Sequence, residues 1–193
     1  MLNFAAIAII LVPLYFVLLF INYKKRKTFI EHMIFTTFYI YICLVIKVTL
    51  FQIPIDSLLL NSLRLNGGYP FNLIPLKSII SSYSDGPSQF LMQVGGNILM
   101  FVPTGTYIPL LSKKMSSFTK SIILAILISI MIELTQGVIS LIIGFGYRSV
   151  DVDDIILNTI GATNGYIFLK IMILPFLLKN PWLMNKEQTT SVN

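Results

Sequence analysis

The chain carries little charge, and this scarcity excludes most soluble folds. Only 11% of its 193 residues are charged, whereas 55% are hydrophobic and the mean hydropathy is +0.82. A soluble domain has about 25% charged residues, so this chain lacks the polar surface needed to face water on all sides. Its composition predicts an all-α integral membrane protein, and its length indicates one small domain.

Residues suited to disulfide and zinc chemistry are almost absent as well. The single cysteine, Cys43, cannot form an intramolecular disulfide, and the sequence has no paired Cys and His set of the kind that zinc requires. The single histidine, His32, lies beside Glu31 at the boundary of an apolar run and is interpreted as an interfacial residue. The net charge of +6 comes mostly from short basic clusters between apolar runs. This arrangement is typical of membrane topology, and no nucleic-acid partner is expected.

Five apolar runs are long enough to cross a bilayer, which takes about 20 residues. They cover residues 2–23, 29–53, 89–111, 121–143 and 155–178. The first run has no basic residue ahead of it and no small-residue cleavage site behind it, which predicts a retained span rather than a signal peptide. We therefore expect a membrane domain at 29–180, preceded by a transmembrane helix and basic loop at 1–28 and followed by a polar cytoplasmic tail at 181–193.

The basic residues predict an orientation. They cluster after the first, third and fifth runs, whereas the opposite segments have only Arg64, Lys77 and Arg148. By the positive-inside rule, the N-terminus is expected outside and the C-terminus in the cytoplasm. The segment 54–88 then lies outside, and the helical spacing of apolar residues from Leu76 to Tyr83 indicates a short interfacial helix within it.

A polar stretch, Arg148 to Tyr166, interrupts this apolar pattern. Asp154, Asn158, Gly161 and Gly165 follow one another at helical spacing and share one face of a helix. Polar side chains and glycines of this kind are unfavourable or unnecessary on a helix surface that faces only lipid. We therefore expect this face to contact protein, water or a ligand. The spacing of the two glycines also matches small-residue helix packing, which alone would account for both.

Three acids begin this stretch: Asp151, Asp153 and Asp154. Their carboxylates could bind a divalent cation, although the spacing of an EF-hand loop is missing. The alternatives are a salt bridge with Arg148 and N-capping of the following helix by Asp153 or Asp154, which the helix dipole favours.

Glu133 is the only acid deep within a predicted span, and charge at such depth is costly unless it has a role. Gln136 lies one turn further on, and Ser129 and Ser140 share the same side. Glu133 is therefore a candidate functional residue. The alternative is a buried structural carboxyl, either protonated or paired with Lys47.

Relative depth suggests that polar residues of three spans converge. At 1.5 Å per residue, Gln136 and Asn97 are expected about 10–12 Å below the outer surface, Glu133 about 15 Å and Asn158 about 6 Å. Helix packing could join them in one cavity that opens toward the acids, or the amides could simply hold helices together.

The third run contains Pro103, Gly105 and Pro109, which loosen the backbone hydrogen bonds of a helix. Two interpretations remain open: a kinked helix that lines a pocket, or a kink that allows close packing.

Four ordered motifs resemble the VanZ-like family over roughly residues 35–178. They are Asn72-Leu-Ile-Pro75, Gly96-Asn97-Ile-Leu-Met-Phe101-Val-Pro103-Thr-Gly105, Glu133-x-x-Gln136, and the stretch from Arg148 through Asp151, Asp153, Asp154, Asn158, Gly161 and Gly165 to Tyr166. Asn164 departs from the apolar residue expected there. The resemblance implies a multi-pass protein of the bacterial cytoplasmic membrane, whose founding relative is associated with low-level resistance to the lipoglycopeptide teicoplanin. It implies no established reaction.

Two functions follow as hypotheses. In the first, an envelope protein lowers susceptibility to glycopeptide antibiotics of the teicoplanin type by binding a lipid-like or cell-wall-precursor ligand. Its ligand-binding residues would be Asn97, Glu133, Gln136, Arg148, Asp151, Asp153, Asp154 and Asn158, supported structurally by Asn72, Pro75, Pro103, Gly105, Gly161 and Gly165. In the second, a membrane-embedded enzyme acts on a lipid-linked envelope substrate, with Glu133 as the acid or base and Asp154 as a further catalytic candidate. A transporter is disfavoured because no inverted repeat is visible.

Overall fold

The computed structural model describes residues 4–24, 28–50, 71–143, 146 and 148–179. The expected basic loop after the first helix and the polar tail at 181–193 lie largely or wholly outside the described residues, as does the first part of the 54–88 segment. The chain packs as two compact units, one made of residues 1–52 and 170–193 and the other of residues 53–169. Each unit is described separately.

The described elements are almost all helical, as the composition predicted. In chain order they are α1 (Phe4–Lys24), α2 (Phe29–Leu50), strand β1 (Phe71–Asn72), α4 (Lys77–Ser84), α5 (Pro87–Phe90), the π-helical turn η1 (Leu91–Gly95), α6 (Gly96–Leu111), the 3₁₀ turn η2 (Lys113–Met115), α7 (Phe118–Ile143), strand β2 (Val150–Asp151), α8 (Val152–Phe168), the π-helical turn η3 (Leu169–Ile173) and α9 (Leu174–Lys179).

Four helical stretches are long and apolar enough to cross a membrane. They are Phe29–Leu50, Pro87–Leu111, Phe118–Ile143 and Val152–Lys179. The last two begin three residues earlier than expected. In α1 the corresponding apolar stretch is shorter, Ala8–Lys24, so the fifth span and the orientation stay predictions. The chain is accordingly a multi-pass helical membrane protein.

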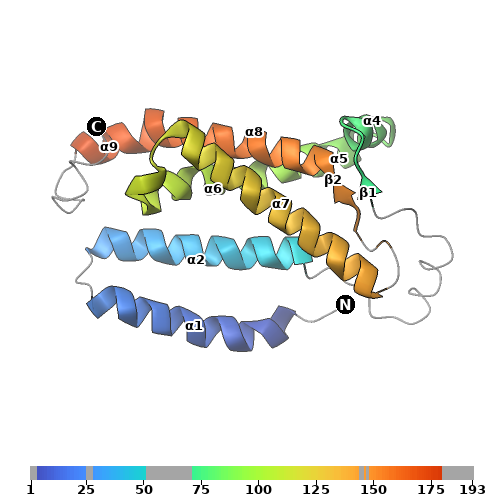
Figure 1. Ribbon diagram of the computed structural model, residues 1–193. Coiled ribbons are helices and arrows are strands. Elements are labelled where there is room, and N and C mark those ends of the chain that lie inside the picture. The colour runs from blue at the N-terminus through green and yellow to red at the C-terminus, as the bar shows by residue number, and fades with distance from the viewer. Residues whose placement is uncertain (1–3, 25–27, 51–70, 144–145, 147, 180–193) are drawn as a thin grey trace. The chain divides into compact units, whose positions relative to one another are not determined.

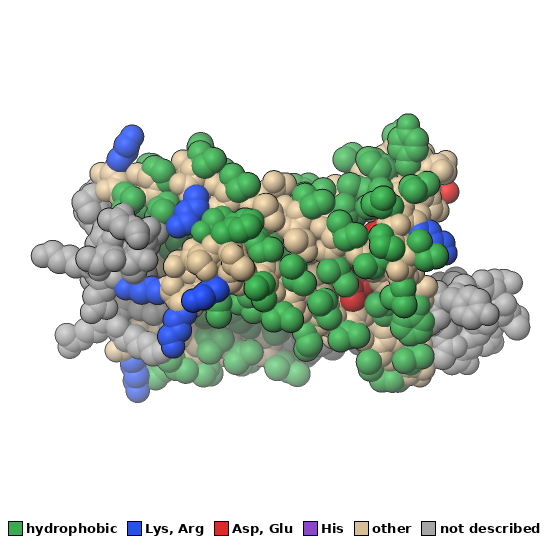
Figure 2. All heavy atoms as spheres, turned by 45° about the horizontal axis from the view of Figure 1, so that its top comes forward, with side chains coloured by type: hydrophobic (Ala, Val, Ile, Leu, Met, Phe, Trp, Pro, Cys, Tyr) green, Lys and Arg blue, Asp and Glu red, His purple; other side chains and the backbone are tan. Residues whose placement is uncertain are grey.

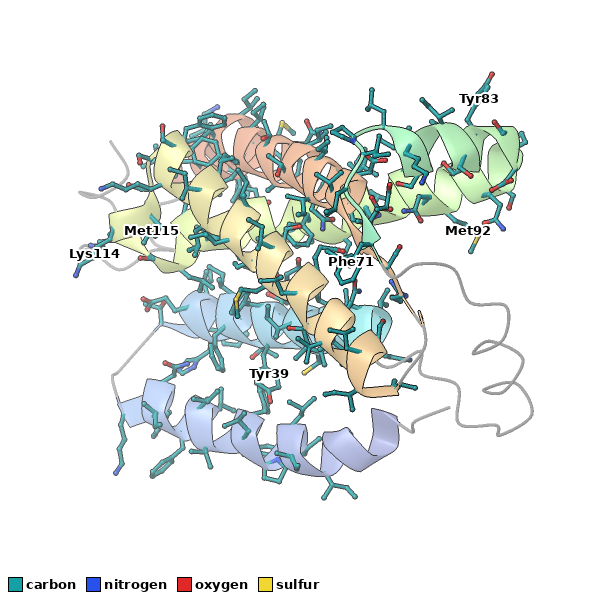
Figure 3. All side chains as sticks on the ribbon, turned by 45° about the vertical axis from the view of Figure 1, so that its right-hand side comes forward. Tyr39, Phe71, Tyr83, Met92, Lys114 and Met115 are labelled. Atoms are coloured by element: carbon teal, nitrogen blue, oxygen red, sulfur yellow. The ribbon has the colours of Figure 1, made fainter. Side chains whose placement is uncertain are left out.

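In the first unit, α1 and α2 form a hairpin (Figure 1). Tyr39 lies between the two helices (Figure 3), where its hydroxyl donates to the carbonyl of Leu11 at 2.6 Å. The Tyr15 ring packs against Tyr39, and its hydroxyl bonds Thr36 at 3.1 Å. At the start of α2, Thr28 and Glu31 exchange hydrogen bonds in a capping box.

The core of the second unit is the pair α6 and α8, with α7 packed obliquely across them (Figure 1). The two helices touch backbone to backbone. A Cβ atom added at Gly105 would overlap the carbonyl of Ala162, and one added at Gly165 would overlap that of Val102. The Thr106 hydroxyl, 3.1 Å from the Gly165 carbonyl oxygen, bridges the same contact. Helices in lipid associate through such close contacts because no hydrophobic effect drives them together.

The helix α6 continues through both of its prolines. The change in helical geometry lies earlier in the span, at the π-helical turn Leu91–Gly95 that joins α5 to α6. Because a π turn fits one extra residue into the helix, it shifts the direction of the side chains that precede it.

Two short strands were not expected. Phe71 pairs with Val150 and Asn72 with Asp151 in a parallel ladder. Each strand has only two residues, too few to show the alternation of apolar and polar residues by which a strand is predicted from sequence. The ladder brings the chain before α4 against the chain before α8.

We expect Gly165→Ala to destabilise the second unit, because its new methyl group would meet the Val102 carbonyl with no space to move. Overpacking of this kind costs about 1–3 kcal/mol, which should lower the midpoint of thermal unfolding in detergent. Gly96→Ala is the matched control, because Gly96 is exposed in the same helix pair and nothing lies within 4 Å of its added Cβ. It should leave the midpoint unchanged or raise it. Equal midpoints for both variants would contradict the backbone contact.

Candidate functional site

A polar stripe on α7 holds an extended piece of chain. The Ser140 hydroxyl donates to the Arg148 carbonyl at 2.7 Å and also lies 3.3 Å from the Arg148 nitrogen, which donates to it. Two turns earlier on α7, the Glu133 carboxylate accepts the backbone N–H of Asp151 at 2.8 Å. Between these contacts, Gly137 leaves room for Val150, whose side chain would clash with a Cβ there.

The spacing of these contacts fits their geometry. Seven residues of helix from Glu133 to Ser140 rise about 10 Å, and three extended residues from Arg148 to Asp151 span about the same distance. The chain therefore runs antiparallel along α7. Side chains of α7 and the backbone of β1 supply hydrogen bonds to this non-helical segment.

This geometry corrects the expected depths. Asp151 was placed at the surface and Glu133 about 15 Å below it, yet the two are hydrogen-bonded. The estimate was wrong because the chain after α7 returns along that helix before α8 begins. The same error affected Asn97, which was expected well below Asp154 but donates to it directly.

Asp151 is the N-cap of α8. Its Oδ1 accepts the Asp153 backbone N–H at 2.9 Å, and Asn72 donates its side-chain amide to the same oxygen at 2.9 Å. The prediction that Asp153 or Asp154 caps this helix was therefore wrong. An N-cap residue has an extended backbone, and Asp151 ends the short strand β2.

Asp153 instead holds the start of α4. It is fully buried, and its two oxygens accept the N–H groups of Leu76, Ser78 and Ile79 and the Ser78 hydroxyl. Leu76 has a left-handed backbone with φ of 67°, which costs an L-residue roughly 1–2 kcal/mol. The carboxylate offsets this cost by satisfying the first N–H groups of α4. Pro75 lies in the exposed turn just before.

Asp154 has a third role and is partly exposed. Its Oδ1 accepts hydrogen bonds from the side-chain amides of Gln93, at 2.8 Å, and Asn97, at 2.6 Å. Its Oδ2 accepts none from the described part of the chain. These three residues, here named the Asp154 cluster, link α8 to the span that contains the π turn. Gln93 lies within that turn, which the sequence analysis did not detect.

The surroundings of the cluster are mainly apolar. Of the acids described in residues 53–169, only Asp85 and Asp154 have appreciable exposure. In Figure 2 the acidic side chains appear only as small patches on a face where hydrophobic side chains are numerous. Arg148 is close enough to interact electrostatically with both Glu133 and Asp154. The region thus combines one cation, a partly exposed carboxylate and two amides.

Asn158, one turn beyond Asp154, donates to the Ser129 hydroxyl at 2.9 Å and is 1% exposed. The side-chain oxygen Oδ1 of Asn158 is buried without a hydrogen-bond partner among the described residues, and so is Oδ1 of Asn72. Gln136 is also buried on α7. These residues lie inside the helix packing rather than at its surface.

The described residues contain no group of three or more His, Cys, Asp or Glu arranged to hold a metal ion. The three acids diverge, because each carboxylate is directed to a different partner. A divalent cation at this motif therefore has no such ligand set in the described part of the structure.

The predicted site residues thus separate into two groups. Asp154, Asn97 and Arg148 lie where a ligand could reach them, whereas Glu133, Gln136, Asp151, Asp153 and Asn158 are buried. Among the predicted structural residues, Gly161 joins Gly105 and Gly165 in the backbone contact, because its Cβ would meet the Ile98 carbonyl. Asn164, the departure from the family pattern, is exposed. The sequence analysis missed Gln93, although its spacing of four residues from Asn97 is a helical signal.

Asp153→Asn should destabilise the protein, because both carboxylate oxygens accept hydrogen bonds and an amide would turn its NH₂ toward one set of donors. An unsatisfied buried donor costs about 1–3 kcal/mol. Asp151→Asn is the control, because both donors bond the single oxygen Oδ1, which Asn retains, and Asn and Asp cap helices alike. Thermal unfolding in detergent should give a lower midpoint for Asp153→Asn only. A larger loss for Asp151→Asn would refute these assignments.

Comparison with known proteins agrees with the motifs. The family model described as VanZ/LLP1 matches residues 38–174, which is more than two thirds of the chain. No curated protein and no solved structure matches it. The matched residues include all of α6, α7 and α8, together with both short strands. The chain therefore belongs to the VanZ/LLP1 family.

Proposed function

We propose that this chain is a bacterial envelope protein that lowers susceptibility to lipoglycopeptide antibiotics by binding an amphiphilic ligand at the Asp154 cluster. The ligand would be a membrane lipid, a lipid-linked cell-wall precursor or the lipoglycopeptide itself. The observation that carries the proposal is Asp154 itself: a partly exposed carboxylate fixed by two amides on an apolar surface. A carboxylate that is partly removed from water is costly unless its oxygens are paired, so a polar ligand would offset part of this cost.

The chemistry of the cluster indicates how a ligand would be bound. Asp154 Oδ2 can accept a hydrogen bond from a hydroxyl, amide or ammonium group, while Gln93 and Asn97 keep the carboxylate from rotating. Arg148, in electrostatic range of Asp154, would bind an anionic group such as a phosphate. A head group that carries both kinds of atoms therefore suits the site. By the positive-inside rule, we expect this site in the outer leaflet.

The proposal predicts that Asp154→Asn abolishes protection while the protein still accumulates. Asn can accept both amide hydrogen bonds at Oδ1, so the helix contact survives while the charge is lost. The variants would be expressed at matched membrane abundance in a susceptible Gram-positive host. The readout is the inhibitory concentration of teicoplanin, beside that of vancomycin, which lacks the lipid tail.

Asp85→Asn is the matched control, because it removes the same charge from an exposed acid, the C-cap of α4, which is not part of the cluster. It should keep the protection that the wild type gives. Protection specific to teicoplanin that only Asp154→Asn removes would support the proposal. Full protection from Asp154→Asn would overturn the role of the cluster, and no protection from the wild type would overturn the resistance function.

A second function, a membrane-embedded enzyme acting on a lipid-linked substrate, is favoured by one observation at Glu133. One oxygen of its buried carboxyl accepts the Asp151 N–H, and the other accepts no hydrogen bond from the described residues. That oxygen could take part in proton transfer, with Arg148 and Asp154 nearby.

Glu133→Gln separates the two functions. The amide oxygen can still accept the Asp151 N–H, so the fold should survive, but the side chain can no longer transfer a proton. A binding protein should keep its protection, whereas an enzyme should lose it completely. Lipid profiles of cells that overexpress the wild type or the variant provide the second measurement. A profile that the wild type leaves unchanged would contradict the enzyme.

A further inference from the structure

The short helix α4 has three different sectors around its axis. Its inner sector, Ser78, Ile79 and Ser82, is turned toward the protein and is partly or fully buried. The outer half of the helix is exposed and consists of two further sectors, one apolar and one polar. Leu76, Ile80 and Tyr83 form an apolar sector with 52%, 63% and 74% exposure. Lys77, Ser81 and Ser84, also exposed, form a polar sector beside it.

The division of the exposed half into an apolar and a polar sector indicates that α4 contacts both hydrocarbon and water. An exposed half that faced only water would gain nothing from clustering large apolar side chains on one side. An exposed half that faced only hydrocarbon would not carry a lysine and two serines. The boundary between hydrocarbon and head groups offers both media, and tyrosine is enriched there.

Apolar side chains are also exposed at the start of the membrane-spanning helix. Tyr83 packs edge-on against Phe90 of α5, with ring centroids 5.7 Å apart. Directly after Phe90, Leu91 and Met92 are 70% and 72% exposed, and they lie within the span Pro87–Leu111. Tyr83 and Met92 both point away from the two helices, on opposite sides of them (Figure 3). The α4–α5 hairpin thus extends the lipid-facing surface of the span.

Asp153 fixes the position of this hairpin relative to the Asp154 cluster, and therefore the depth of one relative to the other in a membrane. Its carboxylate bonds the first turn of α4, and the next residue, Asp154, belongs to the cluster with Gln93. Gln93 in turn follows the exposed Met92. The Asp154 cluster and the three-sector helix are therefore held at one level by direct hydrogen bonds.

We infer that α4 and α5 are inserted into one leaflet at the boundary between hydrocarbon and head groups, and that they set the Asp154 cluster at head-group level. The partner of this surface is the lipid bilayer. The inference stands independently of the resistance function, because it concerns where the cluster lies and not what the cluster does.

The test uses single tryptophans as depth reporters. The chain's one tryptophan, Trp182, is replaced by Phe, and Tyr83→Trp, Met92→Trp or Ser84→Trp is added. Each full-length variant is reconstituted into phosphatidylcholine vesicles that carry bromine either close to the head group or close to the chain end. Iodide in the buffer reports access from water. Ile80→Trp and Ser81→Trp form a second pair if a first variant does not keep the wild-type unfolding midpoint.

Tyr83→Trp and Met92→Trp should be quenched by bromine close to the head group more than by bromine at the chain end, and only weakly by iodide. Ser84→Trp should be quenched strongly by iodide and only weakly by bromine at either depth. Equal iodide quenching at positions 83 and 84 would mean that the hairpin lies in water and would overturn the inference. Chain-end quenching of Ser84→Trp would mean deep burial and would overturn it as well.

Discussion

The second unit depends on one contact: an extended piece of backbone, Arg148 to Asp151, runs along α7 and is held there by hydrogen bonds to protein groups. The α7 stripe supplies these bonds through Ser140 and Glu133, with Gly137 giving the room. The strand β1 pairs with the same segment at Val150 and Asp151. Because Asp151 is thereby fixed, α8 begins at a defined point, and the next two acids have defined directions.

From that fixed start, three acids within four residues have three different roles. Asp151 caps α8, Asp153 caps α4 and Asp154 bonds the span that contains the π turn. The first two roles organise the fold, and of the three acids Asp154 is the one that is partly exposed. On α7, one oxygen of Glu133 supports the backbone of Asp151, while the other accepts no hydrogen bond from the described residues.

The glycines of α6 and α8 complete the arrangement. Backbone contact at Gly105, Gly161 and Gly165 brings the two helices close enough for Asn97 to reach Asp154. Wider spacing would separate amide and carboxylate, and the cluster would lose its rigidity. Packing that is necessary for helix association in lipid thus also determines the geometry of the candidate site.

The sequence by itself determined the membrane class, the bounds of the long helices to within a few residues, the short helix after Leu76, and the family. Hydropathy and helical spacing are local patterns in the chain, so they can be recognised without knowledge of the tertiary structure. Only the tertiary structure decided which acid caps which helix, the pairing of β1 with β2, the role of Gln93 and the common level of Glu133 and Asp151. Each of these depends on the return of the chain along α7. A return of this kind brings together residues far apart in sequence, and no local pattern encodes it.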